Sequence, residues 1–262
     1  MTPHPPAGRP DVAAVAVPAH AKLNLDLVVL GRRPDGHHEI RTRFQAISLH
    51  DLLIVETAAL THLEGGVPDD LVLRAQRALA EAAGRDLPAR LRLVKRIPIG
   101  AGLGGGSADA AAALRGLSRV YGLRCDLAPI AAGLGADVPF LVYGGSAIGT
   151  GLGERLQPVA PDTGWYAVVW PGFPVSTGDV YRRWDEVGGA GPNQLRRAAF
   201  AVEPRLAEFA DMLGPGWHLT GSGAAFFRRC RTRAEAESAV RAGASAGWTA
   251  VARPLGPWSR PG

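Results

Sequence analysis

Glycines crowd the segment 98–117, PIGAGLGGGSADAAAALRGL, where five of them fall between Gly100 and Gly106, just ahead of Ser107. Glycine adopts positive φ without strain and lets a ligand approach the backbone closely. Backbone N–H groups that converge at the start of a helix bind anions, above all phosphate. The segment therefore predicts a phosphate-binding loop; the alternative is a tight strand-to-helix turn without a ligand. The residues that we expect at this loop are Pro98, Gly100, Gly102, Leu103, Gly104, Gly105, Gly106 and Ser107.

Three known phosphate loops can be compared with this one. The Walker pattern is absent, because no lysine follows the glycines. Gly100, Gly102 and Gly105 match the spacing of the dinucleotide fingerprint, which leaves a Rossmann-type oxidoreductase as an alternative. The preceding segment, ARLRLVKRI, is charged, unlike the continuous apolar strand of a parallel sheet. The protein-kinase motifs H-R-D and D-F-G are also missing.

Lysine is rare in this chain, since Lys22 and Lys95 stand alone among 29 lysines and arginines. A chain that uses arginine for its ordinary surface cations suggests that a retained lysine meets a need for a compact charge, although two lysines could also survive by chance. Lys95 precedes the glycine loop, where it either contacts a nucleotide or reaches back to solvent. Lys22 lies between leucines of an expected strand, where the alternative is a solvated strand face.

Asp137 is the carboxylate whose surroundings suit chemistry best. It lies in the segment GADVPF, between glycine-rich turns and an apolar stretch that we expect to be a strand. A carboxylate in such a place suits a general base that takes a proton from a substrate hydroxyl. On the residues alone, an aspartate that caps or closes a turn is the stronger alternative.

The composition favours small anionic ligands. The net charge is +5 and the isoelectric point about 9.7, but the arginines are scattered and aromatic residues make up only 6%. Nucleic-acid binding calls for a basic stripe with interleaved aromatics, so we expect no nucleic-acid partner. No apolar run is long enough for a membrane helix, and Cys125 and Cys230 lie far apart without a CxxC motif, so we expect a reduced, cytoplasmic protein.

The elements that must position these residues follow from periodicity and turn chemistry. Residues 1–10 are expected to be a disordered leader, and 11–57 a β-rich unit. Strands are expected at 14–33, 40–57, 89–97, 165–172 and 248–255, with a strand–turn–strand unit at 217–230. Helices are expected at 69–84, 107–120, 203–213 and 232–247, and the segment 127–151 reads as a short helix followed by a strand. A linker near 155–160 divides the chain.

The glycine segment resembles the central motif of the GHMP kinases. Three further stretches extend the resemblance to residues 18–250, namely AKLNLDLVVLGRRPDGHHEI, GLGADVPFLVYGGSAIGTGLGERLQPV and LTGSGAAFF. The resemblance implies an α+β fold of two domains: a ribosomal-S5-domain-2-like ATP-binding domain over 11–157 and a smaller α/β-plait-like domain over 158–262. It implies ATP-dependent phosphorylation of a hydroxyl with Mg²⁺, and the opening and GADVPF segments are most similar to family members whose substrate carries a cytidylyl group.

The resemblance also implies roles for single residues. Lys22 and Asp137 match the catalytic pair, and Asn24, two residues from Lys22 on the same strand face, positions the substrate. His38 matches the residue that reads the base. The Ser107 hydroxyl reaches phosphate or Mg²⁺, with an ordinary helix N-cap as the alternative. The remaining residues expected to contact nucleotide or substrate are Lys95, His37, Tyr181, Gly221, Ser222 and Gly223.

Two positions depart from the family pattern: His37 stands where a tyrosine is usual, and Asp70 where an asparagine is usual. The pair His37–His38 could indicate a metal site, but no third ligand is spaced near it. The other open alternatives are another GHMP small-molecule kinase and an RNA-binding module, because the first domain resembles one in ribosomal proteins. We expect a monomer or a weak homodimer.

Overall fold

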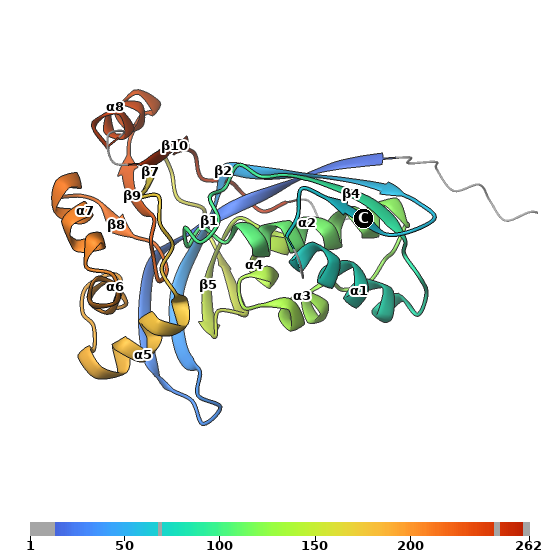
Figure 1. Ribbon diagram of the computed structural model, residues 1–262, viewed down its shortest axis with the longest axis horizontal. Helices are drawn as coiled ribbons and strands as arrows, with labels where there is room; N and C mark the ends of the chain where they lie inside the picture. The colour runs from blue at the N-terminus through green and yellow to red at the C-terminus, as the bar shows by residue number, and fades with distance from the viewer. Residues whose placement is uncertain (1–13, 68–69, 244–246, 259–262) are drawn as a thin grey trace, which may run out of the picture.

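The computed structural model describes residues 14–67, 70–243 and 247–258, so the expected leader at 1–10 lies outside the described residues. The chain forms two sheets with helices packed against them (Figure 1). The first sheet runs in the order β3-β4-β2-β5-β6, with β1 paired to β2. Its strands are β1 (Ala14–Arg32), β2 (His38–Thr57), β3 (His62–Glu64), β4 (Ala89–Val94), β5 (Ser146–Gly151) and β6 (Arg155–Val159).

The second sheet runs in the order β10-β7-β9-β8. Its strands are β7 (Trp165–Trp170), β8 (His218–Leu219), β9 (Phe226–Cys230) and β10 (Trp248–Ala252). Every pair of neighbouring strands in the two sheets is antiparallel except β3 with β4. A Rossmann fold needs a parallel sheet built from βαβ units, so the Rossmann alternative is wrong.

The first sheet is covered by helices α1 (Leu71–Ala83), α2 (Gly105–Val120), α3 (Ala128–Leu134) and α4 (Val138–Tyr143), which lie together beneath β1, β2 and β4 in Figure 1. The remaining helices surround the second sheet: α5 (Thr177–Val187), α6 (Arg196–Val202), α7 (Arg205–Leu213) and α8 (Arg233–Gly243). The expected α+β fold class is therefore confirmed, with the strands grouped in two separate sheets.

Strand β1 ties the molecule together because its alternate residues are buried in three successive cores. Valines and alanines at its start pack against α2 and the first sheet. Its middle residues meet the second sheet, and Leu27 and Val29 near its end pack with α5, α6 and α7. The period of two that predicted the strand thus also joins the two halves. The middle core holds Ala21, Leu23, Leu25, Ile47 and Leu103 on one side and Tyr166, Val168, Ala225 and Phe227 on the other.

Helix α1 begins and ends as expected from its caps. Asp70 accepts a hydrogen bond from the Val72 N–H at 2.9 Å, and Gly84 closes the helix with a φ of +63°. Helix α8 carries half of a capping box: the Thr232 hydroxyl accepts from the Glu235 N–H at 3.1 Å, while the Glu235 carboxylate accepts from Arg231 N–H. Each of these capping residues lies within a few residues of the helix end that it caps, so the helix ends can be predicted from the sequence.

Several expectations for individual elements need correction. Residues 138–143 form helix α4 and no strand, because an apolar run of this length fits a buried helix as well as a buried strand. Strand β4 ends at Val94, so Lys95 lies beyond it. Helix α2 begins at Gly105 with Gly104 as its N-cap, so Ser107 lies within the first turn and the N-cap alternative for it is wrong. Residues 155–159 form strand β6, paired with β5, where a linker was expected, and helices α5 and α6 were not expected at all.

Candidate active site

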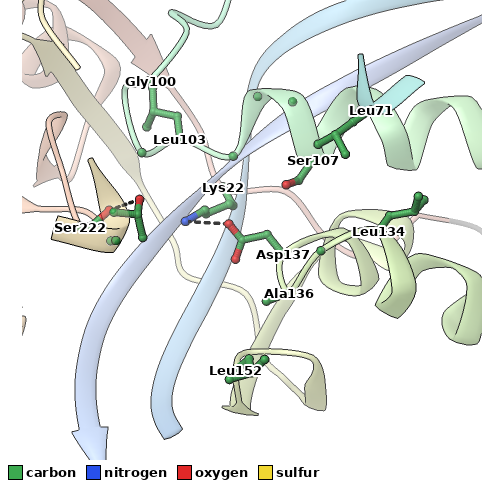
Figure 2. A pocket seen from close by; sticks show the side chains of 18 of the residues that line it. Lys22, Leu71, Gly100, Leu103, Ser107, Leu134, Ala136, Asp137, Leu152 and Ser222 are labelled. Atoms are coloured by element: carbon green, nitrogen blue, oxygen red, sulfur yellow. Dashed lines mark hydrogen bonds and ion pairs between the residues drawn. The ribbon is translucent and has the colours of Figure 1, made fainter. Parts of the chain in front are cut away.

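A single cavity of about 1090 Å³ gathers most of the expected residues between the two halves of the molecule. Its walls come from the glycine loop and the start of α2, from β1, from the end of α3 and the start of α4, from α5, and from the 221–222 turn. Figure 2 shows how Lys22, Asp137, Ser107 and Ser222 converge on it from different elements. A cavity of this size has room for a nucleotide and for a second small molecule beside it.

The glycine loop forms one wall of the cavity and needs glycine for its backbone. Gly104 has a φ of +72°, and a Cβ there would lie 3.0 Å from Cγ of Lys22. Gly102 has a φ of +77°, and a Cβ there would lie 2.4 Å from the carbonyl oxygen of Gly223. The loop delivers the N-terminus of α2 to the cavity, and Figure 2 shows the Ser107 hydroxyl on the side that faces Lys22 and Asp137. Such a helix start attracts anions.

Lys22 and Asp137 form an ion pair at the centre of the cavity, with 3.2 Å between Nζ and Oδ2. The side chain of Lys22 is 6% exposed and that of Asp137 is 30% exposed. Asp137 stands at the N-cap position of α4, yet its side chain makes no capping hydrogen bond. The carboxylate is therefore turned to Lys22 and the cavity (Figure 2), and the structural alternative of a helix cap does not describe it.

Asn24 holds the ammonium of Lys22 from the other side. Its Oδ1 accepts a hydrogen bond from Lys22 Nζ at 2.6 Å, and its Nδ2 donates to the Thr42 hydroxyl at 2.8 Å. The Asn24 backbone N–H donates to the hydroxyl of Thr220 in the second half of the molecule, also at 2.8 Å. Lys22 and Asn24 share a strand face as expected, and the network fixes where the ammonium lies.

Lys95 does not reach into solvent, since its ammonium lies between the carboxylates of Asp51 and Asp109. The distance from Nζ to Oδ2 of Asp109 is 2.6 Å, and Oδ1 of Asp51 accepts from the Ile97 N–H at 2.8 Å. The pKa of Asp109 is raised to about 7, first because burial penalises its charged form; the ammonium of Lys95 opposes the shift. Asp51 and Asp109 were missed by sequence reasoning. Their shared partner, Lys95, lies 44 residues from Asp51 and 14 residues from Asp109 in sequence.

The cavity has an aromatic end beside α5, formed by His38 and Tyr181. His38 stacks on Tyr181 with 5.0 Å between ring centroids, and its Nε2 lies 2.6 Å from Oδ1 of Asp185. His37 also lines the cavity, but its side chain is 66% exposed and its Nδ1 faces Asp35 at 3.4 Å. The ring that stacks on Tyr181 is therefore that of His38, not that of His37.

The second glycine turn, residues 221–223, lies only partly in the cavity wall. Gly221 and Ser222 line the cavity, and the Ser222 hydroxyl lies 2.8 Å from that of Thr177 at the start of α5. Gly223 is not among the residues that line the cavity; its carbonyl packs against Gly102, and a Cβ would meet the side chain of Leu219. Gly223 thus supports the glycine loop. It was expected to touch substrate, but it does not line the cavity.

A metal ion would find few protein ligands here. Within residues 14–67, 70–243 and 247–258, no three His, Cys, Asp or Glu side chains cluster as a metal site. Mg²⁺ usually keeps several waters and binds through one or two protein oxygens plus substrate phosphates. The Ser107 hydroxyl beside the expected phosphate site fits that mode of binding. None of the helices in the described part of the chain is long and apolar enough to span a membrane.

Comparison with known proteins agrees with this geometry. The family model described as GHMP kinases N terminal domain matches residues 70–145, which include the glycine loop and Asp137. A relative from Symbiobacterium thermophilum, named 4-diphosphocytidyl-2-C-methyl-D-erythritol kinase, is 45% identical over 203 residues, covering 73% of this chain and 71% of the relative. A relative of the same name from Aromatoleum aromaticum is 36% identical over 271 residues, covering 92% and 95%.

Solved structures extend the likeness to the fold. A crystal structure of 4-(cytidine 5'-diphospho)-2C-methyl-D-erythritol kinase superposes with a TM-score of 0.81 at 36% identity, covering 92% of this chain and all of that one. A homoserine kinase from Cytophaga hutchinsonii superposes with a TM-score of 0.72 at 16% identity, covering 96% and 97%, and at that identity it shows the fold alone.

Proposed function

The chain belongs to the GHMP kinases, and within them to the family of 4-diphosphocytidyl-2-C-methyl-D-erythritol kinases, and we propose the reaction that its residues perform. It transfers the γ-phosphoryl group of ATP to the 2-hydroxyl of 4-diphosphocytidyl-2-C-methyl-D-erythritol, in the non-mevalonate route to isoprenoid precursors. The observation that carries the proposal is the Lys22–Asp137 ion pair, which lies in one cavity with the glycine loop and with the aromatic end at His38 and Tyr181.

The chemistry is assigned to the ion pair. Asp137 accepts the proton of the substrate's 2-hydroxyl, and the hydroxyl oxygen forms a bond to the γ-phosphorus. At the same time the bond between that phosphorus and the β–γ bridging oxygen breaks, and ADP leaves. The ammonium of Lys22, 3.2 Å from Asp137, pairs with the carboxylate before transfer and stabilises negative charge on the attacking oxygen. Asn24 fixes the position of that ammonium.

The nucleotide phosphates are assigned to the glycine loop and the N-terminus of α2. Backbone N–H groups of residues 102–107 donate hydrogen bonds to the phosphates, and the dipole of α2 favours the negative charge of the phosphates at its N-terminus. Mg²⁺, when bound with the nucleotide, neutralises charge on the phosphate oxygens, and the Ser107 hydroxyl is the protein ligand that we assign to it. Lys95, shared between Asp51 and Asp109, lines the same part of the cavity.

The cytidylyl end of the substrate is assigned to the aromatic end of the cavity, where His38 reads the base edge beside Tyr181.

A division of the chain into two domains, 11–157 and 158–262, remains a proposal. The change of sheet between β6 and β7 supports a boundary in this region, although residue 158 lies within β6, and residues 254 and 257 pair back to the first half. The two free thiols of Cys125 and Cys230 suit the cytoplasm, and a monomer or weak homodimer remains the expected state.

A coupled assay that follows ADP release tests this function. We expect turnover with 4-diphosphocytidyl-2-C-methyl-D-erythritol and ATP, and none above background with mevalonate, homoserine or galactose. Phosphate NMR of the product locates the new ester at the 2-position. Turnover with one of the three other alcohols, and none with the cytidylyl substrate, would assign the chain to a different reaction of the same superfamily.

A further inference from the structure

Asp185 lies in contact with His38 and has no part in the function described so far. It stands on α5, one helical turn after Tyr181, and its Oδ1 is 2.6 Å from Nε2 of His38. Its other oxygen, Oδ2, lies 3.7 Å from the guanidinium of Arg32 on β1. Asp185, His38 and Arg32 all line the cavity.

The ring of His38 is held on three sides by the same helix. Tyr181 stacks on its face, Trp184 meets it edge-on with 5.7 Å between centroids, and Asp185 bonds Nε2. The side chain of His38 is only 6% exposed. A ring clamped in this way presents its other nitrogen, Nδ1, in one fixed direction, and Nδ1 makes no hydrogen bond to the described residues.

The chemistry of the carboxylate decides which nitrogen carries the proton. An ionised carboxylate only accepts hydrogen bonds, so the atom facing Asp185 must be Nε2–H. In neutral imidazole the other nitrogen is then an acceptor. On its other side Asp185 faces Arg32, whose guanidinium has only donors to offer. An acceptor at Nδ1 matches an exocyclic amino group and is mismatched with a carbonyl oxygen.

We propose that Asp185 is a positioning residue that holds His38 as the Nε2–H tautomer and so selects cytosine over uracil. Cytosine carries an amino group where uracil carries a carbonyl, so the uridylyl analogue would set two acceptors against each other in a buried site. This inference rests on the proposed function, in which His38 faces the base. A site that leaves a buried polar group unpaired rejects the wrong ligand strongly, here by about 100-fold or more.

The test compares wild type with three variants. Asp185→Asn offers an amide whose carbonyl faces Arg32 and whose NH₂ then faces Nε2, which moves the ring proton to Nδ1. Asp185→Glu keeps an ionised acceptor. Glu186→Gln is the matched control, since Glu186 is the neighbouring residue on α5, is 62% exposed, pairs with Arg183 and does not line the cavity.

Three quantities are measured on each protein. Nitrogen-15 NMR at pH 8 reports the tautomer of His38 without any substrate. Equilibrium binding and kcat/KM are measured with the cytidylyl alcohol and with its uridylyl analogue. We expect the Nε2–H tautomer and a preference of about 100-fold or more in wild type and Glu186→Gln, a preference reduced to about fivefold or reversed in Asp185→Asn, and partial recovery in Asp185→Glu.

The outcomes separate this inference from the function on which it rests. If wild-type His38 carries its proton on Nδ1 or on both nitrogens, or if Asp185→Asn weakens both substrates by the same factor, then Asp185 is merely structural and the inference is wrong. A wild type that binds the cytidylyl alcohol but transfers no phosphate contradicts the proposed function, while the tautomer and the binding ratio still decide the role of Asp185.

Discussion

At the scale of single residues, the ion pair of Lys22 and Asp137 should behave as one unit. Asp137→Asn keeps the shape of the side chain but removes the base, and loss of a general base lowers kcat about 10²- to 10⁴-fold. Lys22→Arg keeps the charge, but the Lys22 side chain is buried against Gly104 and holds Asn24 at 2.6 Å, so a guanidinium does not reproduce the contact. We expect each single variant to lose kcat strongly with ATP affinity nearly unchanged.

The double variant decides whether the two groups cooperate. Residues that act together in one step give non-additive losses, so the double variant should be scarcely slower than the poorer single variant. Single-turnover kinetics and nucleotide titration check this. Losses that multiply would instead assign independent roles to the two residues, and a Lys22→Arg enzyme with near-normal kcat would remove Lys22 from the chemistry.

At the scale of elements, the glycines of the loop differ in what they do. Gly104 needs its positive φ and touches Lys22, so Gly104→Val should lower Tm. Gly106 lies in the first turn of α2, lines the cavity, and has only Leu71 near its missing Cβ, at 3.7 Å. Gly106→Val should therefore keep Tm within a few degrees and weaken ATP binding about tenfold or more, about 1.4 kcal/mol, because its side chain fills the phosphate site.

Thermal unfolding and nucleotide titration on both variants check this division. Full ATP affinity in a folded Gly106→Val protein would contradict the assignment of this helix start to the phosphates. A Gly104→Val protein as stable as wild type would show that the loop tolerates a side chain at its N-cap.

The same scale shows what the sequence could and could not predict. Strands β1 and β2, the capped helix α1 and the glycine loop carry local signals of alternation, caps and turns, and they were predicted. Helix α4 is apolar throughout its length and has no readable period. Helix α5 does carry local signals, an N-cap at Ser176 and apolar residues at helical spacing (Val180, Trp184 and Val187), but they were not used to predict it.

Site residues were predictable only where a motif named them. Lys22, Asn24 and Asp137 lie in such motifs, and the structure brings them together. Asp185 owes its place to His38, which lies 147 residues away in sequence, and Asp51 to Lys95, 44 residues away. Such contacts depend on how β1, β2 and α5 pack together, and hydrophobic periodicity predicts single elements but not their packing.

At the scale of the whole molecule, the end of the chain returns to the first half and closes over His20. After β10, residues 254 and 257 pair with Ile47 and Gly144. The Trp258 ring occupies the space that a Cβ of Gly144 would fill and stacks on His20 with 4.9 Å between centroids. Its Nε1 donates to the Leu141 carbonyl at 3.1 Å. The two halves are therefore joined both by β1 and by this returning segment.

This closure predicts a pH dependence of stability. Burial, followed by the charges of His50 and Arg115, lowers the pKa of His20 to about 4, and its Nδ1 has no partner among the described residues. In the unfolded chain His20 takes up a proton near pH 6.5, whereas the folded protein resists protonation until about pH 4. The unfolded state therefore binds more protons between these values, and stability is lost as pH falls from about 6.5 towards 4.

We expect the Tm of His20→Gln to fall less between pH 7 and pH 5 than that of wild type, because the variant has no group to protonate at this site. Trp258→Ala uncovers His20, so it should lower Tm at pH 7 and also flatten the pH dependence. His62→Gln, which changes an exposed histidine on β3, is the control and should keep the wild-type slope. Scanning calorimetry at several pH values measures all four proteins, and a His20→Gln slope equal to that of wild type would show that acid destabilises the fold elsewhere.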